Sequence, residues 1–123
     1  MGRTYDKQHA TTVVLTADVE AQRLVSFGGG YPSGAAGAGG LTDAQGVAEY
    51  AGKMGEAVSV VTGYSALVMA GGAIDAGAFV KPGTDGKVVA GTIADHCGRA
   101  VDAAGGDGAV IEIILRPHVH PAA

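Results

Sequence analysis

Short runs of β-branched and apolar residues, separated by glycine-rich turns, make up most of the chain. Apolar and polar side chains that alternate over about four to eight positions are typical of strands with one buried face. The pattern predicts the following strands: Thr11–Leu15, Gln22–Ser26, Glu56–Thr62, Tyr64–Met69, Ala78–Lys81, Lys87–Ala90 and Ala109–Leu115. Gly63 is expected to form a turn between the third and fourth strands, and Pro82–Gly86 a hairpin connection.

Two segments also fit a short helix. Thr42 and Gln45 resemble a capping box at the start of Ala44–Met54, and Thr92–Ala104 has the same ambiguity. Glycines oppose a helix in the first segment, because each costs about 1 kcal/mol in a helix interior. We therefore predict an all-β fold, a small β-barrel or sandwich built from two similar β units, with at most one or two short helices.

The two β units are inferred from an internal similarity. Gly39–Gly46 and Gly91–Gly98 both fit the pattern Gly-x-(Leu/Ile)-x-Asp-x-x-Gly. After one residue inserted at Val101, the match resumes between Glu49–Val60 and Asp102–Ile113. Chance similarity in a chain rich in glycine and alanine is the alternative, but the conserved order of the shared positions favours a duplication.

The domain organisation follows from this similarity. The pseudo-repeats span about residues 17–62 and 70–115, within a single β domain at residues 13–116. Residues 1–12 form an N-terminal arm and residues 117–123 a C-terminal tail. Each unit has few bulky residues, so we expect the two units to pack together and share one core.

Composition narrows the classes of partner. The 123 residues suit one domain, and 22 glycines favour many tight turns. The net charge is −4 without any run of basic residues, which argues against nucleic acid. No apolar stretch approaches the roughly 20 residues needed to span a bilayer, and the polar start lacks a signal-peptide segment. We expect synthesis in a cytoplasm, with neither nucleic acid nor membrane as partner.

Candidate metal ligands and nucleophiles are sparse. His118 and His120 alternate on the tail, whereas His96 and Cys97 are adjacent and would point to opposite faces of a strand. Zinc sites usually show two closely spaced pairs of ligands, so no metal site is predicted. The single cysteine is expected to be a small buried thiol, because a nucleophile needs a base and an orienting group. We predict no catalytic residue and no cofactor.

Lys53 suggests one further alternative. The segment Gly52–Gly55 resembles the swinging-arm lysine of biotinyl and lipoyl domains, which are also small and all-β. However, Ala51 and Gly52 stand where that family has an acidic residue or methionine before the lysine. A carrier domain modified on Lys53 is therefore the third interpretation.

Six segments in order resemble the small capsid decoration proteins of tailed bacteriophages. They are Thr16–Val25, Gln45–Ala48, Gly55–Gly63, Ala70–Val80, Thr84–Val88 and Gly108–Ile113. The resemblance covers about residues 14–115. Each segment describes a common β-turn-β element, so their order is more specific than any one of them.

The resemblance implies a structural virion protein that binds the outer surface of a phage capsid and cements neighbouring major capsid subunits. It implies no enzymatic activity and no cofactor. The implied partners are the major capsid protein and the chain itself, as a homotrimer or homodimer. The loop at Gly28–Gly40 and the tail with His118 and His120 depart from the family, so contacts there are not carried over.

Candidate contacts with the capsid or between subunits lie in three places. They are Arg3, Thr4, Tyr5, Tyr31, Ile111 and Ile113. The first three belong to the arm, which could add an edge strand to a capsid subunit. Tyr31 would anchor its loop on a partner. The two isoleucines belong to a nearly continuous apolar strand, which indicates either burial on both faces or a subunit interface.

The runner-up function is a β binding module for glycans or host-surface attachment, displayed on a particle. Sugar sites favour exposed aromatic residues, and the chain has four tyrosines and no tryptophan, which counts against it. The choice between dimer and trimer, the capsid symmetry axis and the host are left open by the sequence.

Overall fold

Strands dominate the structure, a computed structural model that describes residues 7–32, 41, 44–92 and 96–115. The elements in order are β1 (Lys7–Val14), β2 (Leu24–Ser26), β3 (Ala44–Ala48), β4 (Ala57–Met69), β5 (Phe79–Pro82), the 3₁₀ turn η1 (Thr84–Gly86), β6 (Val88–Ala90), β7 (Gly98–Ala100) and β8 (Val110–Leu115). The described residues contain no α-helix. The predicted all-β class is therefore confirmed.

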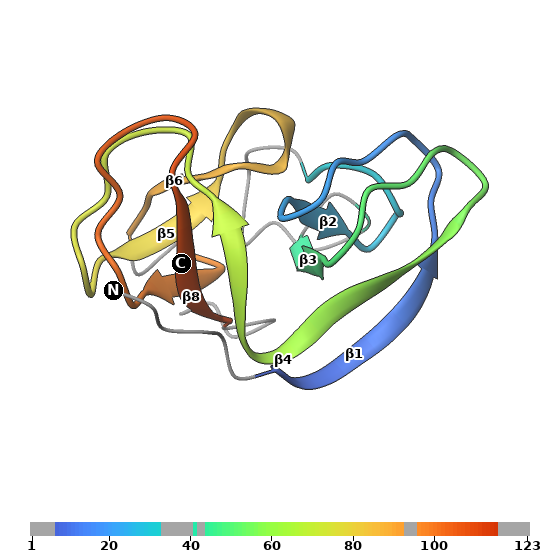
Figure 1. Cartoon of the computed structure of the whole chain (residues 1–123), viewed down its shortest axis with the longest axis horizontal. Coiled ribbons are helices and arrows are strands. Elements are labelled where there is room, and N and C mark those ends of the chain that lie inside the picture. The colour runs from blue at the N-terminus through green and yellow to red at the C-terminus, as the bar shows by residue number, and fades with distance from the viewer. Residues whose placement is uncertain (1–6, 33–40, 42–43, 93–95, 116–123) are drawn as a thin grey trace.

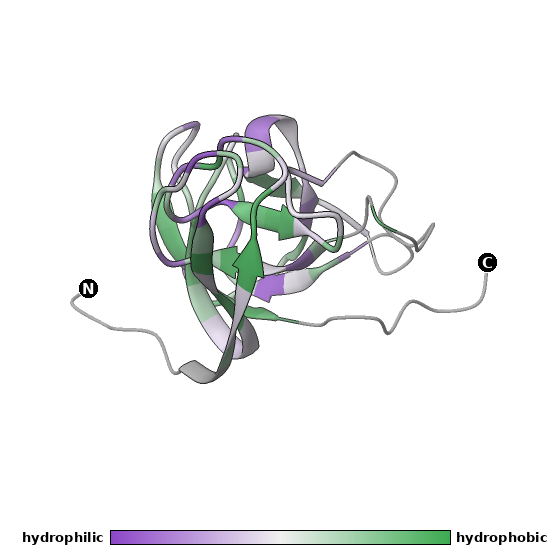
Figure 2. Ribbon diagram, turned by 90° about the vertical axis from the view of Figure 1, so that its right-hand side faces the viewer, coloured by the Kyte–Doolittle hydropathy of each residue, from purple (hydrophilic) through white to green (hydrophobic). Residues whose placement is uncertain are grey.

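The strands form one antiparallel sheet that curls into a nearly closed barrel (Figure 1). Its order is β2-β3-β4-β8-β7-β5-β6, and β1 pairs with β4 beside that path. The hairpin predicted around η1 is present, because β5 and β6 pair on either side of it. Hydrophobic residues concentrate in the strands and hydrophilic ones in the connecting loops (Figure 2). This distribution is the one expected for a barrel that encloses its own core.

The long strand β4 joins the two halves. It has 13 residues and bends near Tyr64, whose φ of 53° lies in the left-handed region. The first part of β4 pairs with β1 and β3, and the second part pairs with β8. The predicted turn at Gly63 is therefore wrong. Both flanking runs are strands as predicted, but each finds partners in the same sheet, so the chain bends there without turning back.

Strands replace the two short helices that the sequence allowed. β3 lies within the first segment and β7 within the second, and the described residues of both segments contain no helix. In each strand one glycine brings the backbone close to its neighbour. A Cβ added to Gly98 would lie 2.5 Å from the carbonyl oxygen of Ile114 in β8, and one added to Gly46 would overlap the carbonyl of Val61 in β4. Gly46, one of the glycines that argue against a helix, therefore permits close strand pairing, and Gly98 does the same in β7.

The two halves share a pattern of backbone hydrogen bonds. Val19 and Gly52 form a mutual antiparallel bridge in the first half, with N–O distances of 2.8 and 2.9 Å. Ile74 and Ala104 form the corresponding bridge in the second half, at 3.0 and 2.8 Å. The two bridges align Gly52 with Ala104, so the extra residue of the second half lies after Ala104. The sequence alignment instead places it at Val101.

The core consists of two clusters of buried residues. The larger cluster draws on both halves: Leu24, Ala44, Val47, Val61, Ala66, Val68, Ala70, Ile74, Val80, Val88, Cys97, Ala100, Ala104, Ile111, Ile113 and Leu115. The smaller one lies within the first half: Leu15, Val19, Val25, Ala48, Val58 and Val60. Adjacent residues of β4, Val60 and Val61, belong to different clusters. The central strand therefore links both clusters.

Candidate functional site

The arm residues predicted to contact a capsid, Arg3, Thr4 and Tyr5, lie outside the described residues, as do His118 and His120 of the tail. The contact roles of the three arm residues stay predictions. The described structure begins with β1 and ends with β8. Residues 7–12 of the predicted arm belong to β1, which pairs with β4.

Tyr31 fastens its loop to the body of its own chain. Its hydroxyl oxygen accepts a hydrogen bond from the backbone amide of Glu20 at 2.9 Å. Its half-buried ring lies against Gly86 and packs on the smaller core cluster. The side chain has a clear role within the fold, and its predicted role as an anchor on a partner stays a prediction.

Ile111 and Ile113 lie in the interior of the barrel. They are 3% and 0% exposed and belong to the larger core cluster. Between them, Glu112 is also buried, and its carboxylate accepts a hydrogen bond from the Ser65 hydroxyl at 2.8 Å. Of the two alternatives for this strand, the structure shows burial on both faces within one chain. These isoleucine side chains therefore offer a partner no surface in this fold.

A surface that the sequence analysis missed lies around the end of β1. It consists of three exposed hydrophobic residues, Val14, Phe27 and Leu41, at 63%, 41% and 72% exposure. We call this the β1-edge patch. Two hydrogen bonds bring its parts together. The Thr16 hydroxyl donates to the carbonyl of Gly28 at 2.7 Å, and the amide of Gly28 donates to the carbonyl of Leu41 at 2.9 Å. The outward position of Val14 in the alternation of β1 was the available signal.

The backbone edge of β1 adds to this surface. Within the described part of the chain, β1 pairs with β4 on one side and with no strand on the other. In the second half, the end of β4 takes the place that β1 has in the first half. At the outer edge of that strand, the amide of Met69 donates to the carbonyl of Gln22 at 2.8 Å. That edge is thus covered by the first half of the chain. An uncovered edge presents backbone donors and acceptors that can pair with another chain.

An open depression of about 580 Å³ lies between the turns that follow β1 and precede β4. Its charged and aromatic lining residues are Asp18, Glu20, Lys53, Glu56, Asp85 and Tyr31. Two of the carboxylates hold the adjacent turn: Asp18 accepts from the amide of Met54 at 3.0 Å, and Glu56 from the amide of Lys53 at 2.8 Å. Tyr31 is the one aromatic residue among them, so the depression offers little stacking surface for a sugar.

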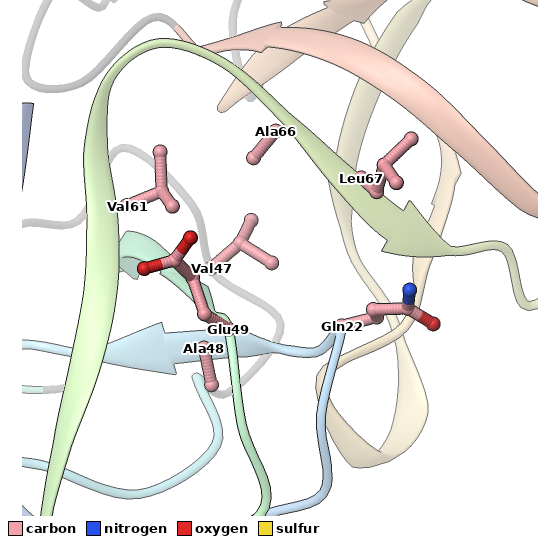
Figure 3. A pocket seen from close by; sticks show the side chains of 7 residues that line it. All are labelled: Gln22, Val47, Ala48, Glu49, Val61, Ala66 and Leu67. Carbon is pink, nitrogen blue, oxygen red and sulfur yellow. The ribbon is translucent and has the colours of Figure 1, made fainter. Parts of the chain in front are cut away.

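A smaller pocket lies where β3 passes the bend of β4 (Figure 3). Its volume is about 50 Å³, and its lining includes Val47, Val61, Ala66, Gln22 and Glu49. Pockets for small-molecule ligands usually measure about 300–1,000 Å³. This space can hold a water molecule, but it is too small for a cofactor.

The other residues considered for metal binding or catalysis, His96 and Cys97, are packed within the fold. His96 and Cys97 are buried, and the ring of His96 packs on that of Phe79 with centroids 4.8 Å apart. In the described residues, no group of three or more histidine, cysteine or acidic side chains could hold a metal ion. Nor does the described part of the chain contain a helix long and apolar enough to cross a bilayer.

Comparisons with known proteins agree with this picture. The fold is similar to the crystal structure of the head fiber gp8.5 N base of bacteriophage phi29, with a TM-score of 0.63 and 23% sequence identity. That match covers 88% of this chain and 93% of the other. No curated protein sequence matches. Residues 5–115 match the family described as phage cement protein. The chain therefore belongs to the phage cement proteins and is a structural protein of a phage capsid.

Proposed function

We propose that the chain binds the outer surface of a phage capsid and cements neighbouring major capsid subunits, acting as a homo-oligomer. Membership of the phage cement family supports a role on the capsid. A binding surface that lacks reactive groups is consistent with an adhesive role.

The observation that carries the proposal is the β1-edge patch beside the open edge of β1. An extended segment of a capsid subunit can add to such an edge, and its main-chain hydrogen bonds then supply affinity. Apolar side chains next to the edge add to binding when they are covered, at about 25 cal/mol per Å² of apolar surface. The patch thus combines directional pairing with hydrophobic burial.

Binding to undecorated, expanded capsids of the cognate phage tests the proposal. We expect saturable binding at a fixed number of copies per capsid and an increase in the temperature at which the capsid ruptures. Val14→Asp should reduce both, because it places a charge in the patch. The matched control is Val110→Asp, since Val110 is also exposed, at 42%, and lies in the second half at the start of β8.

The outcomes separate two failures. If the unmodified protein leaves capsids bare and their rupture temperature unchanged, the proposed function is wrong. If it binds but the two aspartate variants bind equally well, the β1-edge patch is not the contact. Circular dichroism of each variant confirms that the barrel is intact, which is expected because both positions are exposed.

A further inference from the structure

The outer edge of β1 is open over one short, bounded stretch. Within the described residues, the side of β1 that faces away from β4 pairs with no other strand (Figure 1). The pairing of β1 with β4 is regular from Ala10 to Val14, and register shifts interrupt it before Ala10. After Val14 the loop that follows β2 closes the outer edge, because the amide of Thr16 donates to the carbonyl of Gly29 at 3.2 Å. The open stretch is therefore Ala10–Val14.

Alternate residues of this stretch direct their backbone amide and carbonyl groups outward. Along an edge strand of an antiparallel pair, residues alternate between bonding to the neighbouring strand and pointing away from it. Leu15 bonds to β4, since its amide donates to the carbonyl of Glu56 at 2.9 Å, and Thr16 points the opposite way, toward Gly29. The same alternation identifies the outward-pointing residues of the open stretch: Ala10, Thr12 and Val14.

The open stretch lacks the features that usually protect an edge strand. Natural edges often carry charged side chains or proline, which discourage pairing with another chain. Residues 10–14 are Ala-Thr-Thr-Val-Val and contain neither, and four of the five are β-branched, which favours an extended backbone. The stretch ends at Val14 in the β1-edge patch. These features together favour the addition of a strand at this edge.

A second copy of the same strand fits this edge poorly. Two copies of β1 that paired antiparallel about Thr12 would place Gln8 of each copy beside Thr16 of the other. The outer side of Thr16 is already occupied by Gly29, whose carbonyl accepts the hydrogen bond from its amide. The loop would therefore hold the two strands apart at both ends. A segment that turns away after Val14 meets no such obstacle.

We propose that the β1 edge binds a short extended segment of the major capsid protein, which pairs with Ala10–Val14 and turns away where the loop at Gly29 closes the edge. This inference rests on the proposed function and specifies how the capsid partner is held. The residue of the segment beside Val14 is expected to be apolar, because it borders the β1-edge patch. In strand addition, main-chain hydrogen bonds supply affinity and alternate side chains supply specificity.

The first test removes one outward-pointing amide. Thr12→Pro should bind undecorated, expanded capsids about five- to hundredfold more weakly, because one hydrogen bond is lost and its acceptor on the segment is left unpaired. Thr12→Val keeps the amide and should bind at least about fivefold more tightly than Thr12→Pro. The matched control is Gly105→Pro, which lies between β7 and β8 and should stay within about twofold of the unmodified protein.

Proline is compatible with the tested position. It occurs in edge strands where the N–H would face solvent, and Thr12 is exposed. Circular dichroism and urea unfolding of each variant check that the barrel is intact. Should Thr12→Pro fail to fold, Ala10→Pro replaces it, because the amide of Ala10 also points outward. Equal capsid affinities of the folded proline variant and the unmodified protein would overturn the proposal, as would equal affinities of Thr12→Pro and Thr12→Val.

The second test uses the unmodified protein. Hydrogen–deuterium exchange on bare and decorated capsids should reveal one short segment of the major capsid protein that gains protection on decoration. Peptides of this chain that span Ala10–Val14 should gain protection as well, because amides that face water in the free protein become hydrogen-bonded. Unchanged exchange in these peptides on saturated capsids would refute the pairing.

A second copy at the edge would give a different result. Thr12→Pro would then lower the oligomeric state measured by analytical ultracentrifugation without capsids, and that outcome would overturn the proposal. We expect the same oligomeric state for Thr12→Pro and the unmodified protein. Absence of capsid binding by the unmodified protein would instead refute the proposed function. If Val14→Asp weakens binding and Thr12→Pro does not, the proposed function stands and the edge pairing is wrong.

Discussion

Replacing Gly98 by alanine should destabilise the barrel, although alanine is usually the better residue in regular structure. An added Cβ would lie 2.5 Å from the carbonyl oxygen of Ile114 and 3.4 Å from the Cδ1 atom of Ile113. The closer atom belongs to the backbone of β8, so no flexible side chain can move aside. β7 and β8 would have to separate, and forcing an extra group into a packed core costs about 1–3 kcal/mol.

Gly105→Ala is the matched control. Nothing lies within 4 Å of a Cβ added there, and the position lies between β7 and β8, outside both strands. The same chemical change should stabilise the protein by about 0.4–1 kcal/mol, because it reduces the conformational freedom of the unfolded chain. The two alanine variants should therefore differ by about 1.5–4 kcal/mol in the free energy of unfolding.

Urea unfolding followed by circular dichroism measures this difference. The slope of the free energy against urea should be the same for both variants, so that the shift in midpoint reports stability alone. Gly46→Ala should resemble Gly98→Ala, because its Cβ would overlap the carbonyl of Val61 in β4. Indistinguishable midpoints for Gly98→Ala and Gly105→Ala would refute the argument that close strand pairing requires these glycines.

Three further substitutions test individual contacts, each by urea unfolding. Ser65→Ala should cost about 1–3 kcal/mol, because the buried carboxylate of Glu112 loses a hydrogen-bond donor; an unchanged midpoint would show that the bond contributes nothing. Tyr31→Phe should cost about 0.5–1.5 kcal/mol through loss of the bond to the amide of Glu20, and a smaller loss would mean that ring packing alone holds the loop. Gly108→Ala should cost about 1–2 kcal/mol, since φ is 92° there; a gain in stability would contradict that backbone assignment.

The strands were predictable because their alternation is local. Thr11–Leu15 and Ala109–Leu115 carry β-branched and apolar runs; the first overlaps the end of β1 and the second contains β8. The hairpin at Pro82–Gly86 was predictable for the same reason, because turn residues have specific backbone requirements. Local patterns therefore gave the fold class and most of the strands, whereas β3, β7 and the first residues of β1 were not predicted as strands.

Features set by distant pairing were not predictable. Gly63 has the composition of a turn, yet the left-handed residue is Tyr64, and the strand continues because β1 and β8 pair with its two parts. Burial of Glu112 depends on Ser65, which is 47 positions earlier in the sequence. A single sequence gives no measure of such contacts.

The β1-edge patch was likewise predictable only in part. Val14 alternates outward within a predicted strand, so its exposure follows from local pattern. Its proximity to Phe27 and Leu41 does not, because that requires the loop after β2 to return to the end of β1. The isoleucines of β8 were placed among the candidate contacts because a strand buried by its own chain and a strand buried by a partner have the same apolar sequence pattern.

The small size of the adhesive surface has a consequence for how such a protein can cement a capsid. Three exposed apolar side chains cover far less than the roughly 1,200–2,000 Å² that a stable interface usually buries. The remaining area must come from the terminal segments or from several copies acting together. Linked weak contacts bind cooperatively, because each attached contact raises the effective concentration of the next. Under the proposed function, a chain that keeps most of its bulky residues inside two small cores would therefore strengthen a shell by the number of its contacts, not by the strength of any one of them.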